Sequence, residues 1–237
     1  MSFLKVYALI LAGGEGIRFG GDVPKQFLDL NGRMVFEWAI DSFEVSDKVD
    51  EIFLIINSKY KHLAEEILKS GRYRKLRGFS IGGETRQDSV RIGLGLIEDD
   101  EGVVLIHDGV RPFVPLEDIN RLVEELKDKK AVVLASPAKE TMAIAFSSLI
   151  PVVESIPQRD KIFALQTPQG FRLSLIKEAH VKAWNEGFKG ASDDCSLILR
   201  YFKDEKVYLI SGSPYNIKIT YPLDVEIARV LISKLRK

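Results

Sequence analysis

A glycine-rich stretch with two cations, LAGGEGIRFGGDVPKQF, begins at residue 11. Glycine has no Cβ to block the approach of main-chain N–H groups to an anion, and consecutive amides form concave anion sites. Arg18 offers a planar fork of donors and Lys25 a mobile point charge, and both can neutralise phosphoryl oxygens. The stretch therefore predicts a loop that binds a polyphosphate. The glycines expected to line it are Gly13, Gly14 and Gly16.

Two common phosphate-binding loops are excluded by this spacing. The dinucleotide pattern G-x-G-x-x-G fails because Phe19 stands where the third glycine is required. The Walker pattern fails because Asp22 and Val23 follow Gly21 in place of Lys and Ser or Thr. NAD binding and an ATPase-type loop are therefore not expected, and a glycine-rich turn without a ligand is the alternative.

The composition of the whole chain limits its class and its partners. It has 237 residues, 46% of them hydrophobic, which suffices for the core of one α/β domain spanning 1–237. Lys plus Arg and Asp plus Glu both total 34, so no excess positive field exists to hold a nucleic acid. A single cysteine suits a reducing compartment, and no apolar stretch reaches membrane-spanning length. We therefore expect a cytoplasmic protein that binds small anions, with no nucleic-acid or membrane partner.

Short apolar runs alternate with segments of helical period, a pattern typical of a mostly parallel sheet with helices on both faces. The predicted strands are 6–11, 52–56, 78–81, 103–106, 131–135 and 207–210. The predicted helices are 34–45, 59–69, 85–96, 116–126, 173–184, 193–202 and 223–235. The expected fold is a three-layer, doubly wound α/β domain of the Rossmann-like type.

The segment 136–166 interrupts this alternation. It contains two strand-like runs, 141–146 and 152–156, and prolines of a density that does not belong in central strands. We predict a protruding two-stranded β-arm, and such a hairpin is only marginally stable unless its apolar face is covered. A subunit partner is therefore expected, and a self-contained loop excursion is the alternative.

His107, Asp108 and Arg111 follow the predicted strand 103–106, at the edge where open α/β sheets hold their ligands. Asp108 is a candidate Mg²⁺ ligand, because a carboxylate beside a triphosphate needs a cation between the two anions. It could also be a turn residue, since Asp-Gly is a frequent turn dipeptide. Arg111 could contact a ligand or form a buried ion pair, and His107 is expected to pack at the strand end.

Two further motifs carry candidate residues. The sequence GGETRQDSV after the third predicted strand is expected to open a helix capped by Glu84 or Thr85. Ser89 and the backbone of Gly83 could also recognise the edge of a base. Lys218 lies in an alternating, strand-like run, NIKIT, where a lone lysine is usually a solvated surface charge.

Six motifs occur in order along the chain: AGGxGxR, PKQF, GGxxRQDSV, HDxxRP, LQTPQ and NIKIT. Together they resemble the 2-C-methyl-D-erythritol 4-phosphate cytidylyltransferase family, from about residue 5 to the C-terminus. The resemblance implies a Rossmann-like nucleotidyltransferase that transfers a cytidylyl group from CTP to a sugar-alcohol phosphate and releases pyrophosphate, in the non-mevalonate route to isoprenoids. A ribitol-5-phosphate cytidylyltransferase would use nearly the same motifs, and a non-catalytic nucleotide-sensing module is a further alternative.

The resemblance also implies roles for individual residues. Arg18 and Lys25 would bracket the triphosphate. The cytidine pocket would be lined by Ala12, Gly13, Gly83, Glu84 and Ser89. Asp108 would lie near the metal and the acceptor, with Arg111 supporting it. The acceptor phosphate would be held by Thr141, Arg159 and Lys218, and in the family the arm bearing Thr141 and Arg159 reaches the neighbouring subunit's site, which implies a homodimer.

No histidine or pair of carboxylates stands out in the sequence as a general base. A phosphate monoester has a second pKa near ~6, so at neutral pH it is largely a dianion that can attack without one. Catalysis is therefore expected to rest on positioning and on fixed positive charge.

Overall fold

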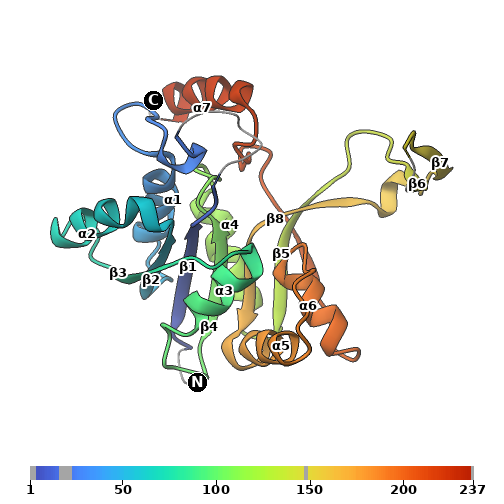
Figure 1. The fold of residues 1–237 in the computed structure, drawn as a ribbon, viewed down its shortest axis with the longest axis horizontal. Coiled ribbons are helices and arrows are strands. Elements are labelled where there is room, and N and C mark those ends of the chain that lie inside the picture. Colours follow the sequence, from blue (N-terminus) through green and yellow to red (C-terminus); the bar gives the residue numbers. More distant parts are fainter. Residues whose placement is uncertain (1–3, 16–22, 147–148, 236–237) are drawn as a thin grey trace.

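A seven-stranded sheet forms the centre of the molecule in the computed structural model, which describes residues 4–15, 23–146 and 149–235 (Figure 1). The strands lie in the order β3-β2-β1-β4-β8-β5-β9. β8 is antiparallel to both neighbours, and the other neighbouring pairs are parallel. A mostly parallel sheet is thus confirmed. The strands are β1 (Val6–Ala12), β2 (Glu51–Ile56), β3 (Leu76–Ile81), β4 (Val103–Asp108), β5 (Ala131–Pro137), β8 (Phe163–Arg172) and β9 (Tyr208–Ser211).

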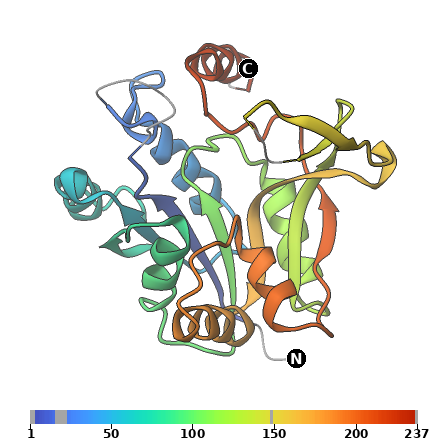
Figure 2. The same ribbon diagram turned by 45° about the vertical axis from the view of Figure 1, so that its right-hand side comes forward.

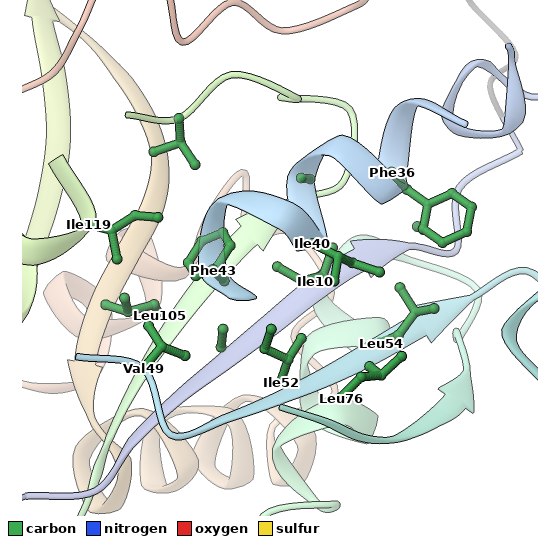
Figure 3. Close-up of a cluster of buried hydrophobic side chains, with 14 of the residues drawn as sticks. Ile10, Phe36, Ile40, Phe43, Val49, Ile52, Leu54, Leu76, Leu105 and Ile119 are labelled. Carbon is green, nitrogen blue, oxygen red and sulfur yellow. The ribbon is translucent and has the colours of Figure 1, made fainter. Parts of the chain in front are cut away.

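Helices cover both faces of the sheet, because alternate residues of a strand point to opposite sides. In β1, Ile10 shares a buried cluster with Phe43 of α1, which Figure 3 shows, whereas Leu9 shares a second cluster with Val90 of α3 and Ile176 of α5. The first face carries α1 (Val35–Glu44), α2 (Lys61–Lys69) and α4 (Leu116–Glu125). The second carries α3 (Arg86–Leu94), α5 (Leu173–Asn185) and α6 (Asp194–Tyr201). The predicted three layers are confirmed.

The last helix, α7 (Pro222–Leu235), packs against a smaller buried cluster. This cluster joins Val225 and Ala228 of α7 to Leu30, Phe113 and Ile219. The 3-10 helices of the described ranges are η2 (Lys25–Phe27), η3 (Ser58–Tyr60) and η4 (Arg159–Lys161). Within those ranges, no helix combines the length and the apolar character needed to span a bilayer.

β8 is a central strand that the sequence patterns do not predict. It carries Pro168 and lies between β4 and β5. Pro168 is paired with neither neighbouring strand. The pairing of β8 with β5 skips from Gln169 to Leu165, and its pairing with β4 ends at Gln169. An irregularity in the ladder removes the need for the proline N–H, which allows a proline in this central strand.

The run 216–220 is a loop, not the strand expected from its alternation. Ile219 is fully buried in the cluster beneath α7, and Ile217 packs against the same cluster. The N–H of Ile219 donates to the carbonyl oxygen of Val110 at 2.9 Å, outside any described ladder. The alternating apolar residues therefore reflect contacts with α7 and not a place in a sheet.

The predicted β-arm is confirmed, but it is shorter than the predicted 136–166, because 136–137 of β5 pair with 163–164 of β8 in the central sheet. β6 (Ile144–Phe146) and β7 (Val152–Ser155) pair antiparallel as a separate two-stranded sheet among the described residues. Figures 1 and 2 show that the arm extends from the body on the side of β5 and β8. All residues of both strands are exposed. The first strand begins at residue 144, later than the predicted 141.

Candidate active site

A cavity of about 520 Å³ opens at the carboxyl ends of the parallel strands β1 to β4. Ligands bind at this edge in open α/β sheets. The segments after β1 and β3, the start of α3, the end of β4 and the loop before α7 all contribute to its lining. The structure thus brings together residues from five of the motifs. Of the predicted site residues, those that line the cavity are Gly13, Gly14, Lys25, Gly83, Glu84, Ser89, Asp108 and Lys218.

The glycine-rich loop after β1 is held by two amide side chains. Gln26 is buried, and its Nε2 donates to the carbonyl oxygen of Ala12 at 3.0 Å and to that of Gly14. From β2, Asn57 Nδ2 donates to the carbonyl oxygen of Gly13 at 3.2 Å. These bonds satisfy the carbonyl groups of residues 12–14 and fix the path of this described part of the loop, which lines the cavity together with Lys25 of η2.

The start of α3 forms another wall of the cavity. Thr85 caps the helix, because its Oγ1 accepts from the N–H of Asp88 at 3.0 Å. Ser89 Oγ accepts from the N–H of Gly83 at 3.1 Å and donates to the carbonyl oxygen of Thr85 at 2.9 Å. A Cβ at Gly83 would lie 2.5 Å from the Cβ of Asp88, so this close approach requires glycine. Of the two predicted caps, Thr85 is therefore confirmed.

Asp108 ends β4 and lies between two cations. Its Oδ1 accepts from Arg86 Nε at 3.2 Å, and its Oδ2 accepts from Lys218 Nζ at 2.7 Å. Burial alone would raise the pKa of this carboxyl, but the charges of Arg86 and Lys218 hold the pKa well below its ordinary value. Asp108 is therefore an ion-paired anion of the cavity and more than a turn residue. Its low pKa makes it unsuited to proton transfer near neutral pH.

Lys218 is positioned by the residues on either side of it. Asn216 is buried, and its Nδ2 donates to the carbonyl oxygen of Thr167 in β8 at 2.8 Å. On the other side, the N–H of Ile219 bonds to the carbonyl oxygen of Val110. Both anchors hold the loop at the cavity, so Lys218 is an ion-paired group of the site and not a solvated surface lysine.

A chain of hydrogen bonds supports the end of β4 beneath the cavity. The N–H of Asp108 donates to Thr167 Oγ1 at 3.0 Å, and this oxygen lies 3.1 Å from His107 Nδ1. His107 Nε2 lies 2.9 Å from the carbonyl oxygen of Arg111. Burial lowers the pKa of His107 to about 4, so the neutral ring donates from Nε2 and accepts at Nδ1 from the Thr167 hydroxyl. The prediction of a packed histidine at the strand end is confirmed.

Arg111 supports the site from behind. Its Nη1 donates to the carbonyl oxygen of Asn216 at 2.8 Å, which links the end of β4 to the loop before α7. Burial lowers the pKa of Arg111, and the neighbouring charge of Asp108 opposes this shift. Within the described chain Arg111 does not line the cavity and forms no ion pair within 4 Å, so its contact is with a carbonyl group.

The remaining predicted residues lie elsewhere. Ala12 is the last residue of β1 and is buried below the cavity lining. Thr141 and Arg159 are exposed in the segment that carries the arm, outside the lining of the cavity of their own chain. Arg18 and Gly16 lie outside the described residues.

Three residues of the site were not predicted from the sequence as site residues. Gln26 and Asn57 hold the glycine-rich loop, and Arg86 contacts Asp108. Gln26 and Arg86 stand inside the PKQF and GGxxRQDSV motifs, which was the available signal. Asn57 directly follows a buried parallel strand, a position where polar side chains collect at the ligand-binding edge.

Known proteins share both the sequence and the architecture of this chain. The family model for 2-C-methyl-D-erythritol 4-phosphate cytidylyltransferase, IspD, matches residues 6–234. Proteins of that name from Thermobifida fusca and Syntrophotalea carbinolica are 36% identical over 232 residues and 38% identical over 231 residues. These matches cover 96% and 97% of this chain, and 93% and 97% of the relatives.

The solved structures agree. The crystal structure of 4-diphosphocytidyl-2C-methyl-D-erythritol synthase from Anaerococcus prevotii matches with a TM-score of 0.84 and 31% identity, over 97% of this chain and 96% of that one. The structure from Thermus thermophilus matches with a TM-score of 0.74 and 29% identity, over 97% of this chain and 100% of that one. The chain therefore belongs to the 2-C-methyl-D-erythritol 4-phosphate cytidylyltransferase family.

Proposed function

We propose that the chain transfers the cytidylyl group of CTP to 2-C-methyl-D-erythritol 4-phosphate and releases pyrophosphate. Membership of the cytidylyltransferase family supports the reaction. The observation that carries the assignment to this cavity is the meeting of Lys25, Asp108 and Lys218 beside a glycine-rich loop. Fixed cations and main-chain amides are the groups that can bring two phosphates together.

The reaction requires one bond to form and one to break at the α-phosphorus of CTP. An oxygen of the acceptor phosphate attacks this atom, and the bond to the oxygen that bridges to the β-phosphate breaks, so pyrophosphate leaves with the bonding electrons. No proton has to be removed first, because the monoester is largely a dianion above its second pKa near ~6. Asp108 is ion-paired and His107 is neutral and buried, which favours this route over one with a general base.

We assign two of the three described cations that line the cavity, Lys25 and Lys218, to different phosphates. Lys25 lies in η2 beside the glycine-rich loop, is only 9% exposed, and is assigned to the triphosphate. Lys218 is held on Asp108 and is assigned to the acceptor phosphate. Arg18 keeps its expected role at the triphosphate, and Gly83, Glu84 and Ser89 are assigned to the cytidine.

Mg²⁺ is the proposed cofactor, with Asp108 as its protein ligand. Mg²⁺ commonly takes one or two carboxylates together with substrate phosphates and water. The two oxygens of Asp108 offer about four lone-pair positions, and Arg86 and Lys218 use two of them. The described residues contain no cluster of three His, Cys, Asp or Glu ligands, so the fit is to an ion shared with phosphates and not to an all-protein site. Such an ion would neutralise phosphate charge.

We also propose a homodimer in which the arm of one copy completes the cavity of the other. Phe146 and Val152 of the arm are 57% and 59% exposed, and a second copy would cover such apolar side chains. The exposed Thr141 and Arg159 would then be delivered to the acceptor end of the partner's cavity. This arrangement accounts for predicted acceptor-binding residues that lie outside the cavity of their own chain.

The proposed function is tested by measuring pyrophosphate release from CTP and Mg²⁺ with two acceptors in parallel. We expect rapid release with 2-C-methyl-D-erythritol 4-phosphate and little with ribitol 5-phosphate at the same concentration. Faster pyrophosphate release with ribitol 5-phosphate would identify that compound as the acceptor. CTP binding without turnover on either acceptor would identify a nucleotide-sensing module. A parallel series with ATP controls for the choice of nucleotide.

A further inference from the structure

Arg86 lies between two buried carboxylates that belong to different elements. At the start of α3, its Nε donates to Asp108 Oδ1 at 3.2 Å and its Nη1 donates to Asp194 Oδ2 at 2.7 Å. Asp108 ends β4 and lines the cavity, whereas Asp194 begins α6 and does not line it. One planar guanidinium therefore ties a residue of the cavity to a residue of the core.

Asp194 is a fixed point of the fold. It is 1% exposed, and its N–H donates to Gln169 Oε1 of β8 at 3.1 Å. Its Oδ1 lies 3.3 Å from Nε2 of the buried His180 in α5. Because Gln169 of β8 holds the main chain of Asp194 and His180 of α5 contacts its carboxylate, Asp194 can anchor Arg86 in one orientation.

We propose that Arg86 is a positioning residue for the acceptor end of the site, and this inference rests on the proposed function. A carboxylate held at one oxygen cannot rotate freely, so Arg86 fixes the direction of the second oxygen of Asp108. That second oxygen accepts from Lys218 Nζ at 2.7 Å. The line from Asp194 through Arg86 and Asp108 thus sets where the ammonium of Lys218 meets the acceptor phosphate.

A direct contact between Arg86 and the triphosphate is the competing role, since Arg86 also lines the cavity. Its Nε and Nη1 are already engaged with the two carboxylates. Its Nη2 is buried and has no hydrogen-bond partner among the described residues, so this nitrogen is not directed at the open space. The geometry therefore favours action through Asp108 and Lys218 over binding of CTP.

The two roles predict different kinetic constants. In Arg86→Gln we expect the KM for 2-C-methyl-D-erythritol 4-phosphate to rise about tenfold, because a misplaced binding group weakens the interaction. The KM for CTP should stay within about twofold, since the described hydrogen bonds of Arg86 go to Asp108 and Asp194 and not to the residues assigned to the cytidine. Arg91→Gln is the matched control, because Arg91 lies on the same helix, stacks over the ring of Trp184 at 4.0 Å and does not line the cavity.

A double-mutant cycle with Lys218→Ala separates positioning from general damage. If Arg86 acts through Lys218, Arg86→Gln should change the acceptor KM less than about twofold in the Lys218→Ala background. Additive effects, or a rise in the KM for CTP in place of that for the acceptor, would overturn the proposal.

A conservative variant protects the test against misfolding. Arg86→Lys keeps the positive charge between the carboxylates but lacks the fork that bridges them, so it should fold and show an intermediate acceptor KM. A wild-type acceptor KM in this variant would show that charge alone suffices and would refute the geometric role. Thermal unfolding checks each protein. Absent turnover by the wild-type chain would instead count against the proposed function, so the two failures are distinguishable.

Discussion

The body of the molecule, which comprises the seven-stranded sheet and its helices, buries most of its apolar residues, whereas the strands of the β-arm expose theirs. Every residue of β4 is buried, and every residue of β6 and β7 is exposed. Leu105 in β4 has no exposed surface, but Phe146 in the arm is 57% exposed. Burial of apolar surface is the main favourable term in folding. The body can therefore be stable within one chain, while the arm needs a cover from outside it.

The cations of the two regions differ in the same way. Lys25 is buried against the body and Lys218 is paired with Asp108, whereas Arg159 is exposed beside the arm. A charge in a partly desolvated cavity interacts more strongly with a phosphate than a solvated charge does. Loss of Lys25 should therefore mainly lower turnover, whereas loss of Arg159 should mainly weaken binding of the acceptor.

The largest effect is expected at Lys25. Lys25→Ala removes a fixed charge that we assign to the triphosphate, and the loss of one such group lowers turnover by about 10²- to 10³-fold. The measurement is kcat from pyrophosphate release at saturating CTP and acceptor, with thermal unfolding to confirm the fold. Lys69→Ala is the control, because Lys69 is an exposed lysine of α2 outside the cavity. Near-normal turnover in a folded Lys25→Ala protein would remove Lys25 from the mechanism.

The next effect is expected at the arm and in a different constant. Arg159→Ala should raise the KM for the phosphorylated acceptor by roughly 10- to 100-fold, since a hydrogen bond to a charged group contributes about 1.5 to 3 kcal/mol. The KM for CTP should change much less. Lys161→Ala, which removes an exposed cation two residues away in η4, is the matched control. The opposite pattern would reassign Arg159 to the nucleotide and erase the division between the two regions.

Most strands of the body could be predicted because buried strands appear in the sequence as short apolar runs. Val6–Ala12 is a continuous apolar run between two covered faces, and its neighbours follow the same rule. β8 was not predicted because Thr167 and Gln169 are polar residues whose hydrogen-bond partners are distant in the sequence. Thr167 satisfies the N–H of Asp108, which lies 59 residues earlier in the chain. Long-range partners of this kind leave no local pattern.

The residues of the candidate site also divide into those predictable from a local motif and those that depend on long-range partners. Lys25, Asp108 and Gly83 could be predicted because each stands in a motif whose residue types suit phosphate chemistry. Arg86 could not be given its place from its motif, because its partner Asp194 lies 108 residues away. The path of the NIKIT run depends in the same way on a cluster with α7, so its alternation was interpreted as a strand.

The cover of the arm can be tested directly. Phe146→Glu places a charge on the apolar surface of the arm, and losing the burial of one large side chain costs about 1.5 to 3 kcal/mol. The dissociation constant of the proposed homodimer should therefore rise roughly 10- to 100-fold. Sedimentation velocity over a concentration series measures it. Glu154→Gln changes the charge of the same arm without adding one to an apolar position and serves as control. A dimer of unchanged stability would place the interface elsewhere.

The smallest effect concerns the stability of the protein in acid. The histidine contribution to it should come from the body alone, because the segment that carries the arm, 136–166, contains no histidine. The pKa of His107 falls from 6.5 to about 4 on burial, so the folded protein favours the neutral ring. The unfolded chain therefore binds the proton first as the pH falls. The contribution of His107 is complete above about pH 6.5 and declines toward pH 4, and near pH 5.5 the loss is about 1 to 2 kcal/mol.

Urea unfolding at pH 8 and pH 5.5 measures this loss. In His107→Gln the part of the acid sensitivity due to this ring should disappear, even if the variant is less stable at both pH values. His62→Gln is the matched control, because it removes an exposed histidine of α2. Phe146→Glu should also keep the wild-type pH dependence, since it alters only the arm. If the arm variant changed the acid response as much as His107→Gln does, the body could not be treated as stable independently of the arm.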